Sequence, residues 1–442
     1  MTLEKNKKSI SAQAWGSLLR HFKPGEKVCL INLGCVRNLV DAQEILGRLK
    51  RAECRIVEPA QATTVILNTC GFIEDAKQES VDMIVDLVDL KRRGKIEKLF
   101  VIGCLSQRYS KELSAEFTEI DGLAGVHPFE TRAVPQQVYL TPAHFAYLKI
   151  CEGCYNQCSF CAIPLIKGRI QSRTRGAILE EVARLDRRGV KELNIIGQDI
   201  TAYGMDLSAS QELPDLLREI CRASRNIEWI RLLYTYPAHV TNELISVVAE
   251  EGKICKYIDI PLQHINDRIL DTMNRGLSSA QTRDLLAGIR NRIPGVRLRS
   301  SFIVGFPGET EAEFQELLDF LQEVRFDRAG AFPFSPEEGT PACHFPDPVP
   351  DSVKRRRYDA LMRCQQKISH QALQDTVGGI FRVLVDEKQK PGENVYIART
   401  EYDAPEVDGA VFVHADKDIP IGTFVQVKIT DALEYDLVGE LV

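Results

Sequence analysis

Continuous apolar segments of strand length alternate with helix-length amphipathic segments along most of the chain. Between Glu26 and about Val126, three such apolar runs occupy 28–33, 65–68 and 99–102. Strands that are apolar on both faces and alternate with helices are typical of a parallel sheet covered by helices on each side. The pattern predicts a small doubly wound α/β domain, with helices over 39–50, 74–92 and a stretch after Ser106.

A second alternating region runs from Phe145 to about Gln374. Repeated strand–helix units of this kind predict a barrel or a partial barrel. The predicted strands are 145–150, 192–196, 229–234, 257–260, 297–304 and 329–333, with helices between them, for example 175–188, 278–293 and 311–324.

The period changes after about Thr376, where short β-type runs are separated by glycine, proline and acidic turns. Five short strands predict a small barrel that resembles an OB-fold. We therefore expect an α/β multidomain protein, with a parallel α/β N-terminal domain, a TIM-like partial (βα) barrel and a C-terminal OB-like β-barrel. The strands expected in the tail are 381–385, 395–398, 410–413, 424–429 and 436–442.

A chain of 442 residues is too long for one ordinary hydrophobic core, so several domains are expected. A proline-containing stretch between the two alternating regions is predicted to be a linker. The residues before the first domain include a possible short amphipathic helix over 14–22, to which we assign no function. The predicted division is an extension at 1–24, an N-terminal domain at 25–132, a linker at 133–142, a barrel domain at 143–374 and a C-terminal domain at 375–442.

Charge and hydropathy exclude several classes of protein. The formal net charge is −6, which argues against a broad basic surface for nucleic acid. No segment contains the roughly 18 uninterrupted apolar residues of a membrane span. The first ten residues are polar and lysine-rich, without the apolar stretch of a secretory signal. We therefore expect a cytoplasmic protein with no membrane partner.

Cysteine is unusually frequent for a chain of this kind, with 13 residues. The number is odd and the expected compartment is reducing, so a disulfide framework is not expected. Metal binding or redox chemistry is the better interpretation, provided that the spacing of the cysteines supports it.

Three cysteines share one short loop at the start of the predicted barrel, Cys154, Cys158 and Cys161. Three thiolates at this spacing can hold three irons of a cubane cluster, and the fourth iron is then free to bind a small molecule. A structural zinc or a ferredoxin-like site is the alternative, because Cys151 could supply a fourth thiolate. Zinc sites prefer four ligands with paired C-x2-C spacing.

Three further cysteines, Cys35, Cys70 and Cys104, are far apart in sequence, but each follows the carboxyl end of a predicted strand. Ligands of open α/β sheets bind at that edge, so the three thiols are expected to meet there. A neighbouring glycine allows close approach of the backbone in each case, Gly34, Gly71 and Gly103. The alternative is that these cysteines are small buried hydrophobic residues. That interpretation is the better one for Cys29, Cys54, Cys221, Cys255, Cys343 and Cys364.

The loop from Cys154 to Cys161 resembles the signature of the radical S-adenosylmethionine (SAM) superfamily, C-x3-C-x-aromatic-C. The resemblance implies a 4Fe–4S cluster whose open iron binds SAM, with Phe160 beside the adenine. One-electron reduction would cleave SAM and leave a 5′-deoxyadenosyl radical, while the protein supplies position and a dry cavity. The signature begins at Cys154, so Cys151 is expected to be a bystander.

Several motifs together resemble the radical SAM methylthiotransferase family over nearly the whole chain after Gly25. Arg37 stands where the family usually has lysine, a mild departure. The resemblance implies that Cys35, Cys70 and Cys104 hold a second 4Fe–4S cluster that handles sulfur. It also implies that one SAM supplies the methyl group and a second the radical, that no catalytic residue is needed beyond the cluster ligands, and that the C-terminal barrel is a TRAM domain that recognises the substrate. The motifs are 32–38 (NLGCVRN), 68–72 (NTCGF), 103–105 (GCL), 261–264 (PLQH) and 302–310 (FIVGFPGET).

Within that family, the sequence resembles the branch that modifies an aspartate β-carbon of small-subunit ribosomal protein S twelve. The segments that carry this resemblance are 38–41, 71–73, 197–199, 234–237 and 403–409. A charge argument agrees, because residues 376–442 contain 13 Asp and Glu against 6 Lys and Arg, a net charge of −7. A domain that grips tRNA should offer basic groups to phosphates, whereas an acidic barrel suits a basic ribosomal protein. The alternative is that the charge only solvates an acidic face.

Further candidates lie near the predicted carboxyl ends of barrel strands, where barrel enzymes place their sites. Gln198, Gln263 and Arg299 are candidate SAM contacts, with packing roles as the alternative, and Gly305 could let the barrel approach the cofactor. His239 and His264 are expected to be structural, since no second metal-type ligand accompanies either.

The expected partners are ribosomal protein S twelve on the small subunit and a reducing electron donor, with nucleic acid contacted only through the ribosome. Two rival functions remain open. A tRNA adenosine methylthiotransferase would share all six cysteine ligands but should bind tRNA with a steep dependence on salt. A non-catalytic iron–sulfur electron carrier would never cleave SAM.

Overall fold

The computed structural model describes residues 15, 20–134, 136–208, 212–390 and 394–442. Most of the predicted extension, including its possible helix, lies outside these residues. Trp15 is buried, donates from its indole Nε1 to the Val126 carbonyl at 3.0 Å, and packs edge-on against His127.

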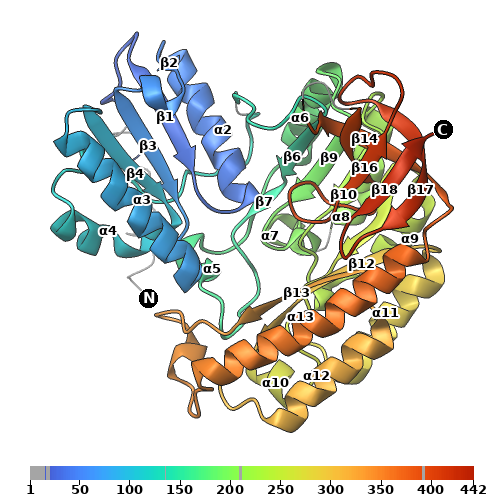
Figure 1. Cartoon of the computed structure of the whole chain (residues 1–442). Helices are drawn as coiled ribbons and strands as arrows, with labels where there is room; N and C mark the ends of the chain where they lie inside the picture. Colours follow the sequence, from blue (N-terminus) through green and yellow to red (C-terminus); the bar gives the residue numbers. More distant parts are fainter. Residues whose placement is uncertain (1–14, 16–19, 135, 209–211, 391–393) are drawn as a thin grey trace.

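The N-terminal unit is a five-stranded parallel sheet of order β2-β1-β3-β4-β5 (Figure 1). Alternate side chains of β3 face opposite sides, so Ile66 packs with α2, while Val65 and Leu67 pack with α3 and α4. This confirms the predicted doubly wound α/β fold. The elements are β1 (Lys27–Asn32), α2 (Val36–Arg51), β2 (Arg55–Ile56), η1 (Pro59–Gln61), β3 (Thr64–Thr69), α3 (Glu74–Arg92), β4 (Lys98–Gly103), α4 (Cys104–Glu116) and β5 (Gly122–Leu123).

The central unit is an open six-stranded parallel sheet of order β13-β12-β11-β10-β9-β6. The strands follow one another in chain order across the sheet, and the sheet does not close on itself, as predicted for a partial barrel. Its strands are β6 (Phe145–Lys149), β9 (Glu192–Ile196), β10 (Trp229–Leu232), β11 (Ile254–Asp259), β12 (Arg297–Val304) and β13 (Arg328–Pro333), with a small hairpin of β7 (Cys151–Glu152) and β8 (Gln171–Ser172).

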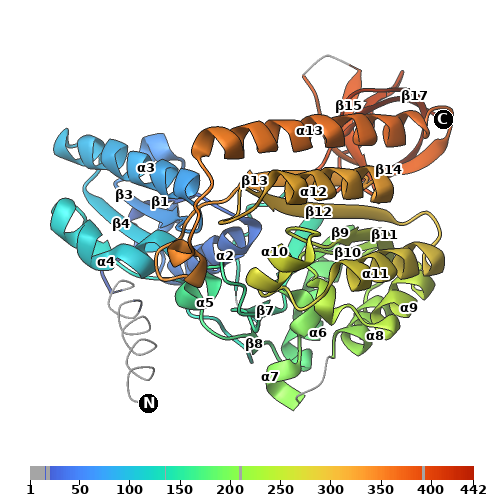
Figure 2. The ribbon, with the colours of Figure 1, turned by 90° about the horizontal axis from the view of Figure 1, so that it is seen from below.

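Helices cover the outer side of this open sheet and bury a large apolar core against it (Figure 2). The last helix, α13, packs along α12 and leads into the C-terminal barrel. The helices are α5 (Ile163–Ile166), α6 (Arg175–Arg187), η2 (Ile200–Ala202), α7 (Met205–Ser208), α8 (Leu213–Ala223), η3 (Pro237–His239), α9 (Asn242–Glu250), α10 (Asp267–Thr272), α11 (Ser279–Arg292), α12 (Glu311–Val324), η4 (Pro341–His344) and α13 (Asp351–Gln374).

The C-terminal unit is a closed five-stranded barrel of order β14-β15-β16-β18-β17, as the sequence predicts. All its strand pairs are antiparallel except β16 with β18, which run parallel. Its strands are β14 (Ile380–Lys388), β15 (Val395–Thr400), β16 (Val411–His414), β17 (Phe424–Ala432) and β18 (Leu437–Leu441).

The connection between β15 and β16 docks the C-terminal barrel onto the open sheet. Tyr257 of β11 donates to the Asp408 carboxylate at 2.7 Å, and Arg328 of β13 pairs with Asp403 at 2.9 Å. Fully buried Arg231 and buried Arg399 share the carboxylate of Glu192, at 2.9 Å and 2.6 Å. Asp403 and Asp408 of the acidic segment 403–409 therefore face the open sheet, whereas Glu406 and Val407 are exposed.

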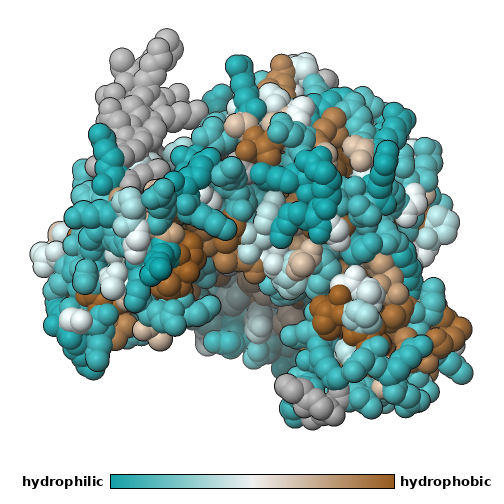
Figure 3. All heavy atoms as spheres, turned by 90° about the horizontal axis from the view of Figure 1, so that it is seen from above, coloured by the Kyte–Doolittle hydropathy of each residue, from teal (hydrophilic) through white to brown (hydrophobic). Residues whose placement is uncertain are grey.

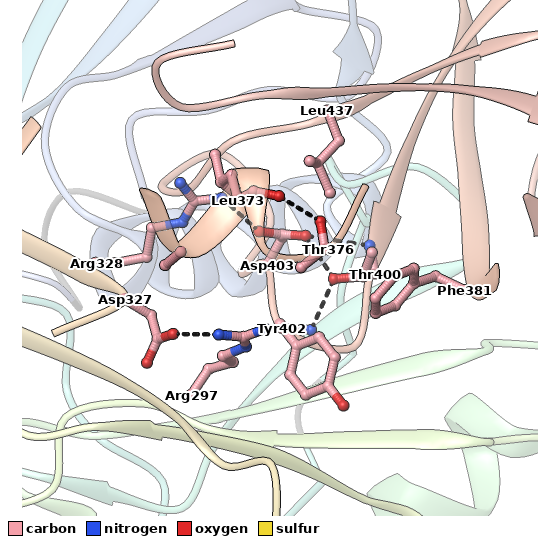
Figure 4. Close-up of a pocket in the computed structure, with 11 residues that line it drawn as sticks. Arg297, Asp327, Arg328, Leu373, Thr376, Phe381, Thr400, Tyr402, Asp403 and Leu437 are labelled. Carbon is pink, nitrogen blue, oxygen red and sulfur yellow. Dashed lines mark hydrogen bonds and ion pairs between the residues drawn. The ribbon is translucent and has the colours of Figure 1, made fainter. Parts of the chain in front are cut away.

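A pocket lies at this same junction (Figure 4). It is bounded by the ends of β12, β13 and α13 and by the C-terminal barrel, with Arg297 paired to Asp327 and Arg328 aimed at Asp403. None of its lining residues is a candidate site residue from the sequence. In the described part of the chain, no helix is long and apolar enough to cross a membrane.

Candidate functional site

The structure brings Cys35, Cys70 and Cys104 to one edge of the N-terminal sheet. They follow β1, β3 and β4, which are adjacent parallel strands. Their carboxyl ends therefore lie side by side, as the position of the cysteines after the strands predicts. The surface of the molecule is hollowed between the N-terminal unit and the remainder (Figure 3).

Two of these cysteines lie at helix N-termini. The sequence did not predict this position. Helix α2 begins at Val36 with Cys35 as its N-cap, and α4 begins at Cys104 itself. The predicted starts were Leu39 and a position after Ser106. Backbone N–H groups and the helix dipole favour negative charge at such positions, so they suit thiolate ligands.

Each neighbouring glycine lies where a side chain would collide. A Cβ on Gly34 would lie 3.1 Å from the Cys70 Cβ, and one on Gly103 would lie 2.6 Å from the Thr69 carbonyl oxygen. Both residues also have φ near +100°, which disfavours any other residue. A Cβ on Gly71 would lie 2.7 Å from the Leu105 amide nitrogen. Glycine is therefore a steric requirement of this edge.

The three thiols interact electrostatically. Burial raises the pKa of Cys104 to about 12, with the nearby charge of Lys167 opposing and ionised Cys35 and Cys70 adding to the rise. Burial also raises the pKa of Cys70. For Cys35, burial is outweighed by the Arg37 guanidinium and by backbone N–H groups, so its pKa is lowered. Three thiols that disfavour one another's ionisation are a donor set that fits a polycationic iron cluster.

The other three cysteines lie in the loop between β7 and α5. Burial and the ionised Cys158 raise the pKa of Cys154, to about 11, and of Cys161, to about 12. The Cys154 amide donates to the Gly168 carbonyl at 3.2 Å, and the Cys161 amide to the Cys158 carbonyl at 3.1 Å. The loop thus gathers three thiols by its own backbone hydrogen bonds, and these thiols also fit an iron cluster.

Cys151 lies in β7, just before this loop. It is fully buried in the core of the open sheet, and its thiol lies 3.6 Å from the Asp199 carbonyl oxygen. Among the described residues, no three His, Cys, Asp or Glu side chains converge closely enough to hold a single metal ion. A cubane cluster keeps its cysteine ligands farther apart than a single ion does. The placement of Cys151 favours the bystander role, which stays a prediction.

Two of the candidate SAM contacts, Phe160 and Gln198, lie in or beside the same loop. Phe160 is half-buried and packs against a cluster of apolar side chains that includes Phe306. Gln198 follows β9 and donates to the Glu152 carboxylate at 3.4 Å, and its buried amide oxygen has no partner among the described residues. An unpartnered buried acceptor next to the cluster loop is available to a ligand.

The remaining candidates are more constrained. Gln263 has φ of 75° and bridges to β12 through its backbone. Arg299 is engaged by Asp259 at 2.8 Å and by Asp408 at 3.4 Å. A Cβ on Gly305 would lie 2.4 Å from the Lys354 side chain, so glycine there makes room for Lys354. Their roles as cofactor contacts stay predictions.

The two predicted structural histidines have partners within the fold. His264 is fully buried, and its Nδ1 accepts the Asn266 amide at 3.0 Å. His239 pairs through Nδ1 with Asp199 at 2.8 Å, and Asp199 also accepts from Asn156 of the cysteine loop. Neither belongs to a convergent set of metal-type ligands among the described residues.

Arg37 connects the N-terminal cysteine site with the central sheet. It donates to the Gly197 carbonyl beyond β9 at 2.9 Å, and its guanidinium lies over the Tyr234 ring at 4.3 Å. It also contributes the positive charge that lowers the pKa of Cys35. A planar guanidinium can stack on a ring and donate at the same time, which lysine does less well. This pairing gives a physical reason for the departure from lysine.

A buried ring of charges spans the same boundary. Lys149 pairs with Asp41 of α2 and, at 2.7 Å, with Glu152, while Lys167 pairs with the same two carboxylates at 3.0 Å and 2.6 Å. Burial opposes ionisation of Asp41, but the two lysines prevail and hold the pKa of Asp41 well below its usual range. No local sequence pattern marks this ring, because Asp41 lies more than 100 positions from its other three members.

Comparison with known protein families gives matches to three separate parts of the chain. Residues 148–321 match the radical SAM superfamily, residues 377–442 match the TRAM domain, and residues 27–125 match the family described as "Uncharacterized protein family UPF0004".

Curated relatives match nearly the whole chain. Proteins named ribosomal protein uS12 methylthiotransferase RimO are 45% identical in Anaeromyxobacter sp. (strain Fw109-5), over 94% of this chain and 93% of the relative, and in Desulforamulus reducens, over 93% and 98%. The chain belongs to the RimO family of radical SAM methylthiotransferases. RimO relatives such as that of Desulfitobacterium hafniense, at 42% identity over 94% of this chain, extend the match.

Among solved structures, this RimO family member is similar to the radical SAM methyltransferase TsrM of Kitasatospora setae. That structure has cobalamin and a 4Fe–4S cluster bound, and it matches with a TM-score of 0.53 and 15% identity over 72% of this chain and 77% of TsrM. At that identity the likeness shows the shared fold alone.

Proposed function

We propose that the protein attaches a methylthio group to the β-carbon of an aspartate in ribosomal protein uS12, using two 4Fe–4S clusters and SAM. The observation that carries the proposal is the convergence of Cys35, Cys70 and Cys104 at the carboxyl edge of β1, β3 and β4. Arg37 links this edge directly to the central sheet, whose cysteine loop is the second site. One molecule thus has two three-thiol sites across a shared boundary.

In this proposal, Cys154, Cys158 and Cys161 hold the cluster that binds SAM, and Cys35, Cys70 and Cys104 hold the cluster that handles sulfur. When bound, the first cluster with SAM supplies a radical able to abstract hydrogen from an unactivated carbon. The protein positions the groups and excludes water. The buried ion pairs of Lys149 and Lys167 with Asp41 join α2 of the N-terminal unit to the central unit.

Phe160, Gln198, Gln263, Arg299 and Gly305 stay our proposed SAM contacts. The unpartnered Gln198 Oε1 gives the most direct support, because a buried amide oxygen without a donor is costly until a ligand supplies one. Arg299 has weaker support, since two carboxylates already engage it.

The names of the relatives support uS12 as the substrate, and the acidic C-terminal barrel adds a weaker argument. Three of its acidic residues are satisfied within the protein rather than presented to a partner, namely Asp386 by His144 and Arg399, Asp403 by Arg328, and Asp408 by Arg299. The acidic residues that face solvent include Asp416, Asp431, Glu434 and Glu440. This smaller exposed set still suits a basic protein partner.

A tRNA substrate is the alternative, and salt dependence distinguishes it. If tRNA were the substrate, several phosphate contacts would make its affinity fall steeply between 50 and 200 mM salt, by about 10³-fold or more for six contacts. We expect only weak tRNA binding with a shallow slope, measured by filter binding. The proposal also requires an external one-electron donor and places the reaction in the cytoplasm, where small subunits are found.

The radical chemistry is tested by removing one ligand. Cys158→Ala should abolish reductive cleavage of SAM to 5′-deoxyadenosine under anaerobic conditions, while Cys364→Ala, which alters a cysteine on α13 far from either loop in sequence, should leave it intact. Liquid chromatography of the products measures the cleavage. Undiminished cleavage by Cys158→Ala would contradict the proposed mechanism, and no cleavage by the wild type would favour the electron carrier.

A further inference from the structure

The end of α10 and the residues after it are hydrogen-bonded to the cysteine loop of the central sheet. The Ser159 amide donates to the Met273 carbonyl at 3.1 Å, and the Ser159 hydroxyl donates to the Thr272 carbonyl at 2.8 Å. Asn274 donates from its side chain to the Gln157 carbonyl at 2.9 Å. Three hydrogen bonds, one at Gln157 and two at Ser159, thus fix this loop to residues 272–274 on both sides of Cys158.

Arg275 is the next residue in that segment, and it reaches the thiol itself. It is 6% exposed, and its Nη1 lies 3.3 Å from the Cys158 Sγ. Its Nη2 donates to the Pro261 carbonyl, and its guanidinium lies over the Tyr236 ring at 4.4 Å. The Tyr236 hydroxyl in turn donates to the Arg275 carbonyl at 2.8 Å. The side chain is therefore held in one orientation, with one N–H aimed at sulfur.

The charge of Arg275 has no carboxylate partner among the described residues. None of their ion pairs includes Arg275, and its Nε is buried without a hydrogen-bond acceptor there. The other deeply buried arginines differ in this respect, since Arg231 pairs with Glu192 and Arg357 with Glu309. A buried cation is costly unless an anion accompanies it. The nearest candidate anion is the Cys158 thiolate and whatever that thiolate holds.

We propose that Arg275 donates a hydrogen bond and a positive charge to the Cys158 ligand, and thereby raises the reduction potential of the SAM-binding cluster. The inference rests on the proposed function, because it requires that cluster. Reduction adds one negative charge to the cluster, and a nearby cation stabilises the reduced state more than the oxidised one. Hydrogen bonds to ligand sulfur and local charge are among the factors that set such potentials. Arg275 acts through Cys158 and is a positioning residue.

Two substitutions separate charge from hydrogen bonding. Arg275→Gln keeps an N–H donor but removes the charge, and Arg275→Lys keeps the charge but loses the planar fork. We expect Arg275→Gln to lower the ratio of reduced to oxidised cluster about tenfold at a fixed solution potential, a shift of about −59 mV for a one-electron couple. Arg275→Lys should shift the potential in the same direction but less.

The measurement is a redox titration of the reconstituted full-length protein, followed by electron paramagnetic resonance. The SAM-binding cluster is identified as the one whose signal changes when SAM is added, and the second cluster serves as an internal reference whose potential should not move. Arg268→Gln is the matched control, because Arg268 lies on α10 with a half-exposed side chain paired to Glu313. Its variant should titrate like the wild type.

Unchanged potentials of the SAM-responsive signal in both Arg275 variants would overturn the inference and leave the proposed function intact. Unchanged potentials overturn the inference even if the variants bind SAM more weakly, because Arg275 would then contact SAM without affecting the cluster. If Arg275→Gln fails to retain its iron, Arg275→Lys carries the test alone. Absence of any SAM-responsive signal in the wild type would remove the proposed function and the inference together.

Discussion

At the scale of single residues, the glycines beside Cys35, Cys70 and Cys104 are not all required for the same physical reason. Gly34 and Gly103 adopt left-handed backbone conformations, whereas Gly71 is required only by the backbone of Leu105. The sequence alone predicted that these glycines allow close approach, and the structure gives the atoms they approach. The contacts could not be derived from sequence, because each joins strands that are about 35 positions apart.

Gly71→Ala tests the steric requirement. The added Cβ would lie 2.7 Å from the Leu105 amide nitrogen, so the backbone of α4 beside Cys104 must shift. Overpacking of this kind costs about 1–3 kcal/mol. We expect a lower urea midpoint and incomplete assembly of the N-terminal cluster, measured as iron per chain. The control is Gly176→Ala in α6, where nothing lies within 4 Å of the added Cβ, and it should retain full iron and stability.

Cys104→Ser tests the assignment of the second set of ligands. A chain with two cubane clusters binds about eight irons, so loss of one cluster should leave about four. We expect this variant to keep SAM cleavage but lose methylthio transfer. Cys151→Ala should keep all its iron, because Cys151 lies in the apolar core. Iron analysis with a product assay measures both, and a Cys104→Ser protein with its full iron content would refute the assignment.

At the scale of elements, the sequence predicted the type and order of most strands and helices but misplaced the two helix starts that matter for the site. Neither α2 nor α4 begins with a side-chain capping hydrogen bond, since their N-caps are Cys35 and Gly103. The usual Ser, Thr or Asp signal is therefore absent at both. For the same reason, the sequence did not predict that Cys35 and Cys104 lie at helix N-termini.

Helix α2 carries a second titratable group whose pH dependence can be predicted. Burial raises the pKa of Glu44 from 4.5 to about 7, with Lys149 opposing and the Asp41 charge adding to the rise. His127 lies 3.5 Å away, and burial lowers its pKa to about 3, so it offers little positive charge near neutral pH. Glu44 therefore stabilises the fold in its protonated form.

Glu44→Gln tests this assignment by the sign of its pH dependence. Because the folded pKa is the higher one, the stability that Glu44 contributes is present below pH 4.5 and is lost as pH rises through about 7. The wild type should therefore lose on the order of 3 kcal/mol relative to Glu44→Gln over this range. Urea unfolding of both proteins at pH 5.5 and pH 8 should show about 2 kcal/mol of this loss, because the rest occurs below pH 5.5. A difference that is independent of pH, or that grows in favour of the wild type, would contradict the assignment.

At the scale of the whole molecule, the sequence predicted three units and both cysteine sets, but not what joins them. Asp41 and Lys149, and likewise Arg275 and Cys158, are paired across more than 100 positions, and no local pattern marks such contacts. The acidic count of the tail also overstated the charge available to a partner, because residues such as Asp408 fold back onto the open sheet. Net charge is a property of composition, whereas exposed charge depends on long-range packing.

The most direct test of the central claim is a competition between the two candidate substrates in one anaerobic reaction. The reconstituted protein, SAM, reductant and sulfide are incubated with small ribosomal subunits and total tRNA, and both substrates are analysed by mass spectrometry. We predict the mass gain of one methylthio group on an aspartate of uS12, with tRNA unchanged. A gain on tRNA adenosine, with uS12 unchanged, would contradict the proposed substrate while preserving the radical chemistry and both clusters.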